Sequence, residues 1–228
     1  MQFIKDIFHL FFHEVCHSCQ EVLHQHEKLI CIACRHDFPE TDFLNQKNNQ
    51  LEKQFYGRVQ IKEAMALFHY TKKGKVQHLI HKLKYKGQED IGVFFGEWLG
   101  NSLKSSDRFQ FIDCIVPVPI HPKKEKQRGY NQLTKLGRTA GETLNLPFIE
   151  NNLVRVINTA AQTHKGRVDR FLGKRNHFEI IDKDLFEGKH ILLLDDVITT
   201  GATIEVCTRE LLKCKNVTVS VAVIAYTT

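Results

Sequence analysis

Residues 191–203 read ILLLDDVITTGAT, and this segment constrains the fold more than any other part of the chain. Four apolar residues indicate a buried strand, two acids follow it, and a Thr/Gly turn leads into a helix. Free backbone N–H groups and the positive dipole end at a helix start attract a phosphate, and Gly201 lets the backbone approach it closely. Asp195 and Asp196 would repel a phosphate, so we expect them to accept hydrogen bonds from sugar hydroxyls beside it. The segment therefore predicts a site for a sugar phosphate.

The predicted sugar-phosphate residues come from one strand end and the turn that follows it. They are Asp195, Asp196, Thr199, Thr200, Gly201, Ala202 and Thr203.

Strands alternate with helices through most of the chain. Strands are predicted at residues 64–70, 111–118, 177–181, 191–194 and 217–225, and helices at residues 76–85, 91–103, 131–144 and 203–213. This alternation is typical of an α/β fold with a parallel sheet covered by helices. In such folds, ligands bind at the carboxyl ends of the strands. The polar run at residues 45–54 shows no apolar periodicity and indicates a linker, which divides a module of residues 1–50 from a domain of residues 60–228.

Two CxxC pairs near the N-terminus predict a metal site. They are formed by Cys16, Cys19, Cys31 and Cys34, with eleven residues between the pairs. Two such pairs complete a tetrahedral tetrathiolate site with no open position, so we expect a structural Zn²⁺. Two alternatives stay open, unliganded thiols and a site in which a nearby histidine replaces one thiolate. The histidines are His17, His24, His26 and His36, and the remaining cysteines, Cys114, Cys207 and Cys214, are expected in the core.

The sequence predicts a cytoplasmic protein without membrane insertion. No stretch reaches the roughly 18 apolar residues that a membrane-spanning helix needs. Residues 3–12 are apolar but interrupted by Lys5, Asp6 and His9, which indicates a short amphipathic helix rather than a signal peptide. Thiols stay reduced in the cytoplasm, in agreement with a metal site rather than disulfides.

Basic residues gather in three segments. Residues 62–86 hold seven lysines against one glutamate, and residues 121–138 and 155–175 each hold six Lys/Arg against one acid. Such segregation favours an anionic partner, a phosphate-bearing ligand or a nucleic acid, over the alternative of solvated helix faces. Residues 116–132 leave a predicted strand near the phosphate turn, so Lys123, Lys124 and Arg128 are candidates to neutralise a diphosphate. Alternatively these charges only solubilise an exposed turn.

All thirteen positions of residues 191–203 resemble the phosphoribosyl diphosphate motif of type I phosphoribosyltransferases. The resemblance implies that the two acids bind the ribose 2- and 3-hydroxyls and that the turn binds the 5-phosphate. Together with the paired CxxC knuckles, the sequences VPVP and RGYNQ upstream of this motif resemble the ComF competence proteins, ComFC-like or GntX-like. Tyr70, Gly74 and residues 82–87 also fit that family. The implied architecture is a type I phosphoribosyltransferase fold with an N-terminal zinc-binding module.

The family's second basic loop corresponds to residues 155–178. Gln162, Arg170 and Phe178 fall where the family pattern expects them, which makes Arg170 a further diphosphate-binding and catalytic candidate. Lys165 and Gly173 depart from the pattern, replacing an apolar residue and an asparagine.

The ComF resemblance implies a role in natural transformation, as a cytoplasmic DNA-uptake factor that handles single-stranded DNA and binds phosphoribosyl diphosphate or ribose 5-phosphate. Positive charge beside stacking faces suits sequence-tolerant binding of single strands. The candidates for it are Lys82, Lys84, Tyr85, Lys86 and Tyr130. A second hypothesis is an active phosphoribosyltransferase of nucleotide or amine metabolism, with Mg²⁺ on the diphosphate and an unknown acceptor. A third is an adaptor whose zinc module docks to a DNA-uptake helicase or recombination factor.

Overall fold

A computed structural model describes residues 14–85, 88–156 and 177–227. The predicted helix at residues 3–12, together with Lys86, Gln162, Lys165, Arg170 and Gly173, lies outside this range. Along the described chain the helices are α2 (Ile32–His36), α3 (Gln50–Lys53), α4 (Lys75–Leu83), α5 (Glu89–Lys104), α6 (Pro122–Arg128), α7 (Gln132–Leu144) and α9 (Ala202–Leu211). The strands are β1 (Ala64–His69), β2 (Cys114–Pro117), β3 (Leu153–Val156), β4 (His177–Ile180), β5 (His190–Ile198) and β6 (Thr218–Tyr226). Two 3₁₀ turns, Asp107–Phe109 and Asp184–Phe186, complete the described elements.

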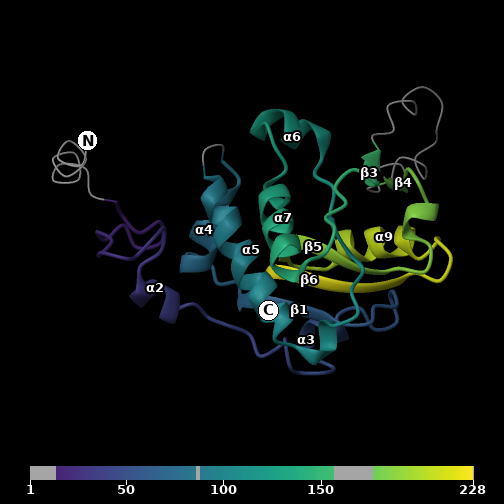
Figure 1. Ribbon diagram of the computed structural model, residues 1–228, viewed down its shortest axis with the longest axis horizontal. Helices are drawn as coiled ribbons and strands as arrows, with labels where there is room; N and C mark the ends of the chain where they lie inside the picture. The colour runs from purple at the N-terminus through teal and green to yellow at the C-terminus, as the bar shows by residue number, and fades with distance from the viewer. Residues whose placement is uncertain (1–13, 86–87, 157–176, 228) are drawn as a thin grey trace, which may run out of the picture.

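A four-stranded parallel sheet in the order β1-β6-β5-β2 forms the centre of the fold (Figure 1). Its two middle strands are almost continuous apolar runs, and Leu192, Leu193 and Leu194 are fully buried. Such runs are typical of parallel strands that are covered on both faces. The prediction of an α/β fold with a parallel sheet and a small cysteine-rich segment before it is confirmed.

Two predicted strands differ from the structure. The strand at 177–181 is not part of the parallel sheet, because β4 pairs antiparallel with β3 in a separate two-stranded sheet. The strand expected from residue 111 begins only at Cys114, and Phe111 is 76% exposed. An apolar residue that flanks a strand raises the apolar count of a sequence window without pairing, so sequence periodicity overestimates the strand's length.

Helices α5 and α7 pack against each other at very short range. A Cβ atom at Gly96 would lie 2.6 Å from the Leu136 carbonyl oxygen and 2.7 Å from Thr139 Cβ. Only glycine permits this approach, which brings the backbones of the two helices together. The contact fixes α7, whose first residue, Gln132, lies at the carboxyl end of the sheet.

The polar run at residues 45–54 is folded rather than an open connector. Asn49 is 1% exposed, caps α3 through the Glu52 amide and donates from Nδ2 to the Ala64 carbonyl oxygen at 2.8 Å. Leu51 is completely buried in the core. The buried polar groups are satisfied by the start of β1, which sequence periodicity does not reveal. The division of the chain near residue 50 stays a prediction.

Arg108 is the centre of a buried ionic cluster that joins this run to the sheet. Its guanidinium forms ion pairs with Glu52 and Glu63, and its side chain is 8% exposed. The same guanidinium donates to the carbonyl oxygens of Phe43, Leu44 and Gln46 at 2.8–3.2 Å. The Arg108 side chain therefore connects the segment before β1 to the rest of the α/β fold.

The cysteine-rich segment lies against β1, α4 and α5. The Thr41 amide donates to the Leu67 carbonyl oxygen at 2.9 Å, so the chain after α2 runs beside β1. Phe38 makes ring contacts with Phe68 and Trp98 at centroid distances of 5.3 and 5.8 Å. Within the described residues, no helix combines the length and apolar character needed to cross a bilayer.

Candidate functional site

The two aspartates lie inside β5, near its carboxyl end. The strand continues through Asp195 and Asp196 to Ile198, four residues beyond the predicted strand end. Asp196 is 8% exposed, and its Oδ2 lies 3.2 Å from Lys84 Nζ and 3.4 Å from Gln132 Nε2. The Asp196 amide donates to Asp195 Oδ1 at 2.8 Å. The acid pair is thus held between α4 and α7, with one lysine beside it.

The surroundings of the Asp195 carboxyl group disfavour its negative charge. Burial raises the pKa of Asp195 well above its usual range, and the charge of Asp196 raises it further. Desolvation disfavours a carboxylate, and a second carboxylate beside it adds repulsion. An acid held in this way is destabilised unless a hydroxyl or a cation reaches it. Such strain is typical of a binding site.

Replacing Asp195 by asparagine is expected to stabilise the folded protein at neutral pH. The folded-state pKa is raised, so the folded chain keeps this proton where the unfolded chain, with a pKa of about 3.9, has lost it. Stability therefore falls as pH rises from the unfolded pKa through the folded pKa, and asparagine avoids that loss.

Thermal unfolding at about pH 7 and about pH 4 measures this effect. The Tm gain of Asp195→Asn should be present at the higher pH and shrink at the lower one. The control Asp42→Asn changes an exposed acid and should leave Tm unchanged. An Asp195→Asn protein that is less stable than wild type at neutral pH would contradict the prediction.

Side chains from the segment before β1 hold the carbonyl oxygens of the Thr/Gly turn that follows β5. Gln54 Nε2 donates to the Thr199 carbonyl oxygen at 2.7 Å, and Arg58 Nη1 donates to the Thr200 carbonyl oxygen at 2.9 Å. Arg58 is held in turn by Glu205 on α9, with an N–O distance of 2.6 Å. The turn carbonyls are therefore engaged by protein side chains.

Of the amide groups of this turn, that of Ala202 donates to Thr200 Oγ1 at 3.4 Å. In the described part of the chain, no hydrogen-bond acceptor is recorded for the backbone N–H groups of Thr200, Gly201 and Thr203. Gly201 has a φ of +70°, and a Cβ there would lie 3.0 Å from the Phe55 ring. The left-handed conformation and the close ring both require glycine. The turn presents N–H donors at the start of α9, and the binding of an anion there stays a prediction.

Gln54 and Arg58 were not among the residues predicted from the sequence. They lie more than 140 residues before the turn, and Gln54 is in the run interpreted as a linker. No local pattern connects them to residues 199–203.

The first basic loop leaves the sheet beside the acid pair. Strand β2 pairs in parallel with β5, so both strand ends lie at one edge of the sheet. Arg128 Nη1 donates to Gln132 Oε1 at 2.6 Å, which connects this loop to Asp196. Lys123 and Lys124 lie exposed on α6. Of the predicted diphosphate ligands, Arg128 is therefore connected to the acids through one side chain, and Arg170 lies outside the described residues.

The predicted nucleic-acid residues have varied surroundings. Lys82 Nζ donates to the His17 carbonyl oxygen at 2.9 Å, while Lys84 pairs with Asp196. Tyr130 donates its hydroxyl to the Leu83 and Tyr85 carbonyl oxygens at 2.5 and 2.8 Å, and burial raises its pKa. Tyr85 itself is 57% exposed, with its ring 5.0 Å from the His81 ring. Lys82, Lys84 and Tyr130 thus bond to other parts of the protein, and Tyr85 is the one of these four described residues that is mostly exposed.

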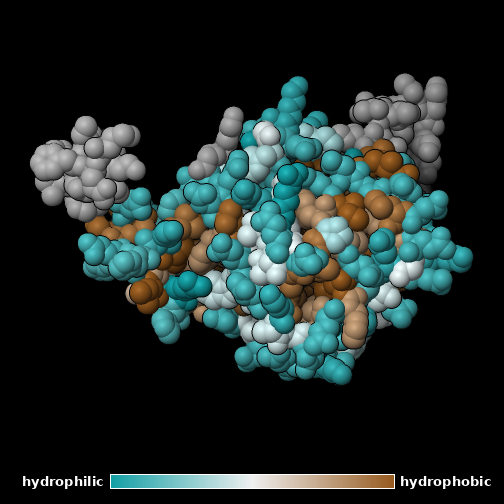
Figure 2. Space-filling view, viewed as in Figure 1, coloured by the Kyte–Doolittle hydropathy of each residue, from teal (hydrophilic) through white to brown (hydrophobic). Residues whose placement is uncertain are grey.

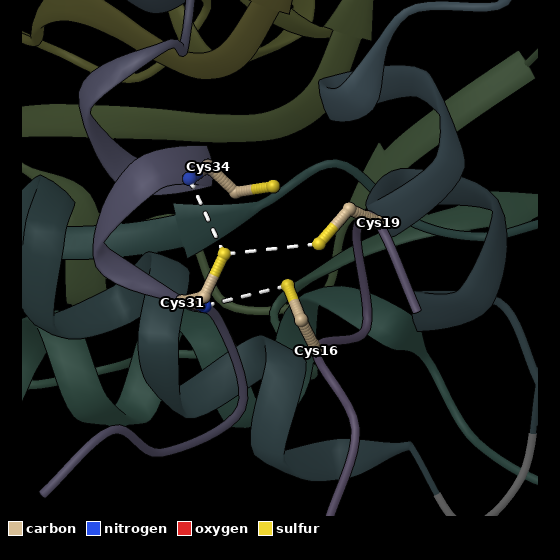
Figure 3. Close-up of side chains that lie close together, drawn as sticks. All are labelled: Cys16, Cys19, Cys31 and Cys34. Atoms are coloured by element: carbon tan, nitrogen blue, oxygen red, sulfur yellow. Dashed lines mark hydrogen bonds between the residues drawn. The ribbon is translucent and has the colours of Figure 1, made fainter. Parts of the chain in front are cut away.

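Four thiols meet near the N-terminus, as the CxxC spacing predicts (Figure 3). The sulfur atoms of Cys16, Cys19, Cys31 and Cys34 lie within 4.8 Å of one another. No histidine belongs to this cluster among the described residues, so the Cys/His alternative has no support. The arrangement fits a divalent metal such as zinc, because four soft thiolates form a closed tetrahedral donor set.

Backbone amides support a negative charge on one of the four thiols, Cys16, whereas burial raises the pKa of Cys31 to about 12. The amides of Ser18 and Cys31 donate to Cys16 Sγ at 3.4 and 3.3 Å. Burial alone would raise the pKa of Cys16, but backbone hydrogen bonds from Cys19, Cys31 and Ser18 bring it down to about 7. The other cysteines, Cys114, Cys207 and Cys214, are buried core residues as predicted.

These features define an α/β protein with a parallel four-stranded sheet that carries a four-cysteine cluster near its N-terminus. Its sequence is similar to those of competence and DNA utilization proteins. It is 26% identical over 205 residues to the competence protein F of Haemophilus influenzae, which covers 85% of this chain and 89% of that protein. It is 26% identical to the competence protein ComFC of Bacillus subtilis, over 88% of this chain and 78% of the relative.

A third relative is the DNA utilization protein YhgH of Salmonella typhimurium, 30% identical over 63% of each chain. Comparison with models of known protein families gives no match. The glutamine phosphoribosylpyrophosphate amidotransferase of B. subtilis, complexed with ADP and GMP, aligns with a TM-score of 0.42 and 15% identity, over 62% of this chain and 30% of that one. The purine phosphoribosyltransferase of Pyrococcus horikoshii aligns with a TM-score of 0.36 and 20% identity, over 60% and 73% of the two chains.

Proposed function

We propose that this protein binds a ribose 5-phosphate group, free or within phosphoribosyl diphosphate, and acts in the uptake or use of DNA. Its similarity to competence and DNA utilization proteins supports the second part. The site at the end of β5 supports the first. One structural Zn²⁺ on the four thiolates would hold the N-terminal module together.

The observation that carries the proposal is the turn of residues 199–203. Side chains of Gln54 and Arg58 hold two of its carbonyl oxygens, while in the described chain the amides of Thr200, Gly201 and Thr203 have no acceptor. These amides and the start of α9 would hold the 5-phosphate. The ribose hydroxyls would then donate to Asp195 and Asp196, which relieves the unfavourable burial of Asp195. Arg128 would approach the diphosphate, and Mg²⁺ would accompany that group when it is present.

Calorimetric titration of ribose 5-phosphate tests this proposal. We expect wild type to bind and the variant Asp195→Asn/Asp196→Asn to bind at least about tenfold more weakly, a difference of about 1.4 kcal/mol. The control Asp42→Asn/Asp184→Asn removes the same charge from two exposed acids elsewhere. Equal affinity in all three proteins, or no binding by wild type, would rule out the site.

Handling of single-stranded DNA is a second candidate function, favoured by α6. None of its residues is buried, and it projects from the molecule at the top of Figure 1, where Figure 2 shows hydrophilic side chains. It carries Lys123, Lys124 and Lys126. Phosphate contacts by such lysines would make DNA affinity depend on salt.

Fluorescence titration of a labelled single-stranded oligonucleotide across a salt series measures this. Replacing Lys123, Lys124 and Lys126 by glutamine should flatten the slope of log affinity against log salt by up to about 2, since each lost phosphate contact contributes about 0.7. The matched control replaces Lys183, Lys213 and Lys215. An unchanged slope in the α6 variant would exclude α6 from DNA binding.

A further inference from the structure

A cavity of about 330 Å³ lies next to the acid pair, between the end of β1 and α4. Its size falls at the lower end of small-molecule sites, which span roughly 300–1,000 Å³. It is lined by Tyr70, Lys73, Gly74, Gln77, His78, Ile80, His81 and Lys84. Lys84 also pairs with Asp196, so the cavity adjoins the proposed ribose site.

The side chains of helix α4 face the core, the cysteine-rich segment and the cavity. One face, with Val76, Leu79, Ile80 and Leu83, is buried in the core. A second face meets the N-terminal module, where Lys75 Nζ lies 2.7 Å from Asp37 Oδ2 and Lys82 Nζ donates to the His17 carbonyl oxygen.

The third face of α4, with Gln77, His78 and His81, borders the cavity, and Lys84 follows directly after the helix. His78 and His81 are exposed. In the described residues, no ion pair is recorded for Lys73 or His78. Lys73 and His78 are therefore available to a ligand, whereas His81 contacts Tyr85 and Lys84 pairs with Asp196.

The charge of the cavity selects the kind of ligand. Two lysines and two histidines line it, and no acid is among its lining residues. Lysine ammonium groups and imidazoles donate hydrogen bonds to phosphate oxygens, and the Tyr70 ring offers a flat apolar surface. A nucleotide has both complementary parts, an anionic phosphate and a planar base.

We propose that this cavity binds a phosphate-bearing ligand of mononucleotide size, as a second site beside the acid pair. Lys73 and His78 would contact the phosphate. Lys84 lies between the two sites and would face both ligands. The inference does not require that ribose 5-phosphate binds at residues 199–203, and its test separates the two sites.

Thymidine 5′-monophosphate is a suitable probe, because it lacks the 2′-hydroxyl that the acid pair would recognise. We expect it to bind wild type and to bind Lys73→Gln/His78→Gln at least about tenfold more weakly. The same variant should bind ribose 5-phosphate as wild type does. Asp195→Asn/Asp196→Asn should bind the thymidine nucleotide at least as well as wild type, since Lys84 loses its partner. The charge control Lys213→Gln/Lys215→Gln should not differ from wild type.

Three outcomes would overturn the proposal. The first is failure of wild type to bind the nucleotide, and the second is equal binding by wild type and Lys73→Gln/His78→Gln. In the third, Asp195→Asn/Asp196→Asn loses nucleotide binding and Lys73→Gln/His78→Gln keeps it, which would mean that the nucleotide binds at the proposed ribose site. If a single-stranded oligonucleotide depends on Lys73 and His78 while the mononucleotide does not bind, the surface belongs to an extended DNA site instead.

Discussion

Removing the metal from the four-cysteine centre is expected to unfold the N-terminal module. Its described elements are short, and α2 has only five residues. Three of its apolar side chains, Val15, Val22 and Ile32, are 40–64% exposed, and Figure 2 shows apolar groups on this segment. Its buried Phe38 packs against Phe68 and Trp98 of the α/β part rather than within the module. We therefore expect the module's own fold to depend on the metal, which supplies about 10–16 kcal/mol in zinc-binding peptides.

Metal analysis and thermal unfolding, each with and without a chelator, measure the effect. We expect one metal ion per chain and a much lower unfolding temperature after chelation. Cys31→Ser should lose the metal, whereas Cys214→Ser, which changes a buried cysteine outside the cluster, should retain it. Equal metal content in both variants, or an unchanged melting curve after chelation, would contradict a structural metal.

Loss of Arg108 is expected to destabilise the α/β part of the protein strongly. Arg108→Met removes the one guanidinium that neutralises Glu52 and Glu63, both largely buried. Removing one partner of a buried ion pair costs about 3–5 kcal/mol, because the remaining charges stay desolvated. The carbonyl oxygens of Phe43, Leu44 and Gln46 lose their shared donor as well.

Urea denaturation followed by circular dichroism tests this prediction. Lys213→Met is the control, because its pair with Glu210 is 58% exposed on the lysine side and should contribute less than about 1 kcal/mol. The triple variant Arg108→Met/Glu52→Gln/Glu63→Gln should recover part of the loss, since no buried charge remains. A loss below about 1 kcal/mol for Arg108→Met would show that the two glutamates are neutral or solvated.

Local sequence predicts the parts of this protein that local interactions determine. The segment at residues 191–203 forms a strand, a turn and a helix because its apolar run, Gly201 and the following periodicity act within thirteen residues. Each cysteine pair is local in the same way, since Cys16 and Cys19 lie in one turn, and Cys31 and Cys34 lie at the start of α2.

The contacts that position the site could not be predicted in this way. Arg108 meets Glu52 and Glu63 across 56 and 45 residues, and Arg58 reaches the turn across 142 residues. Single-sequence patterns contain no signal for such pairs. Lys82 and Lys84 were grouped by charge with the nucleic-acid candidates, but one contacts the module and the other an aspartate. A cluster of lysines in sequence does not reveal what each one faces.

The burial of Asn49 and Glu52 against the start of β1 has a consequence for anyone who wishes to express the two parts of this chain separately. A fragment that starts at residue 60 would leave the Ala64 amide without its bond to Glu52 and expose the Arg108 guanidinium. It would also lack Gln54 and Arg58, whose side chains donate to the carbonyl oxygens of the turn at residues 199–203. Recombinant α/β fragments should therefore begin upstream of Thr41, so that the first strand keeps its neighbour and the turn keeps its shape.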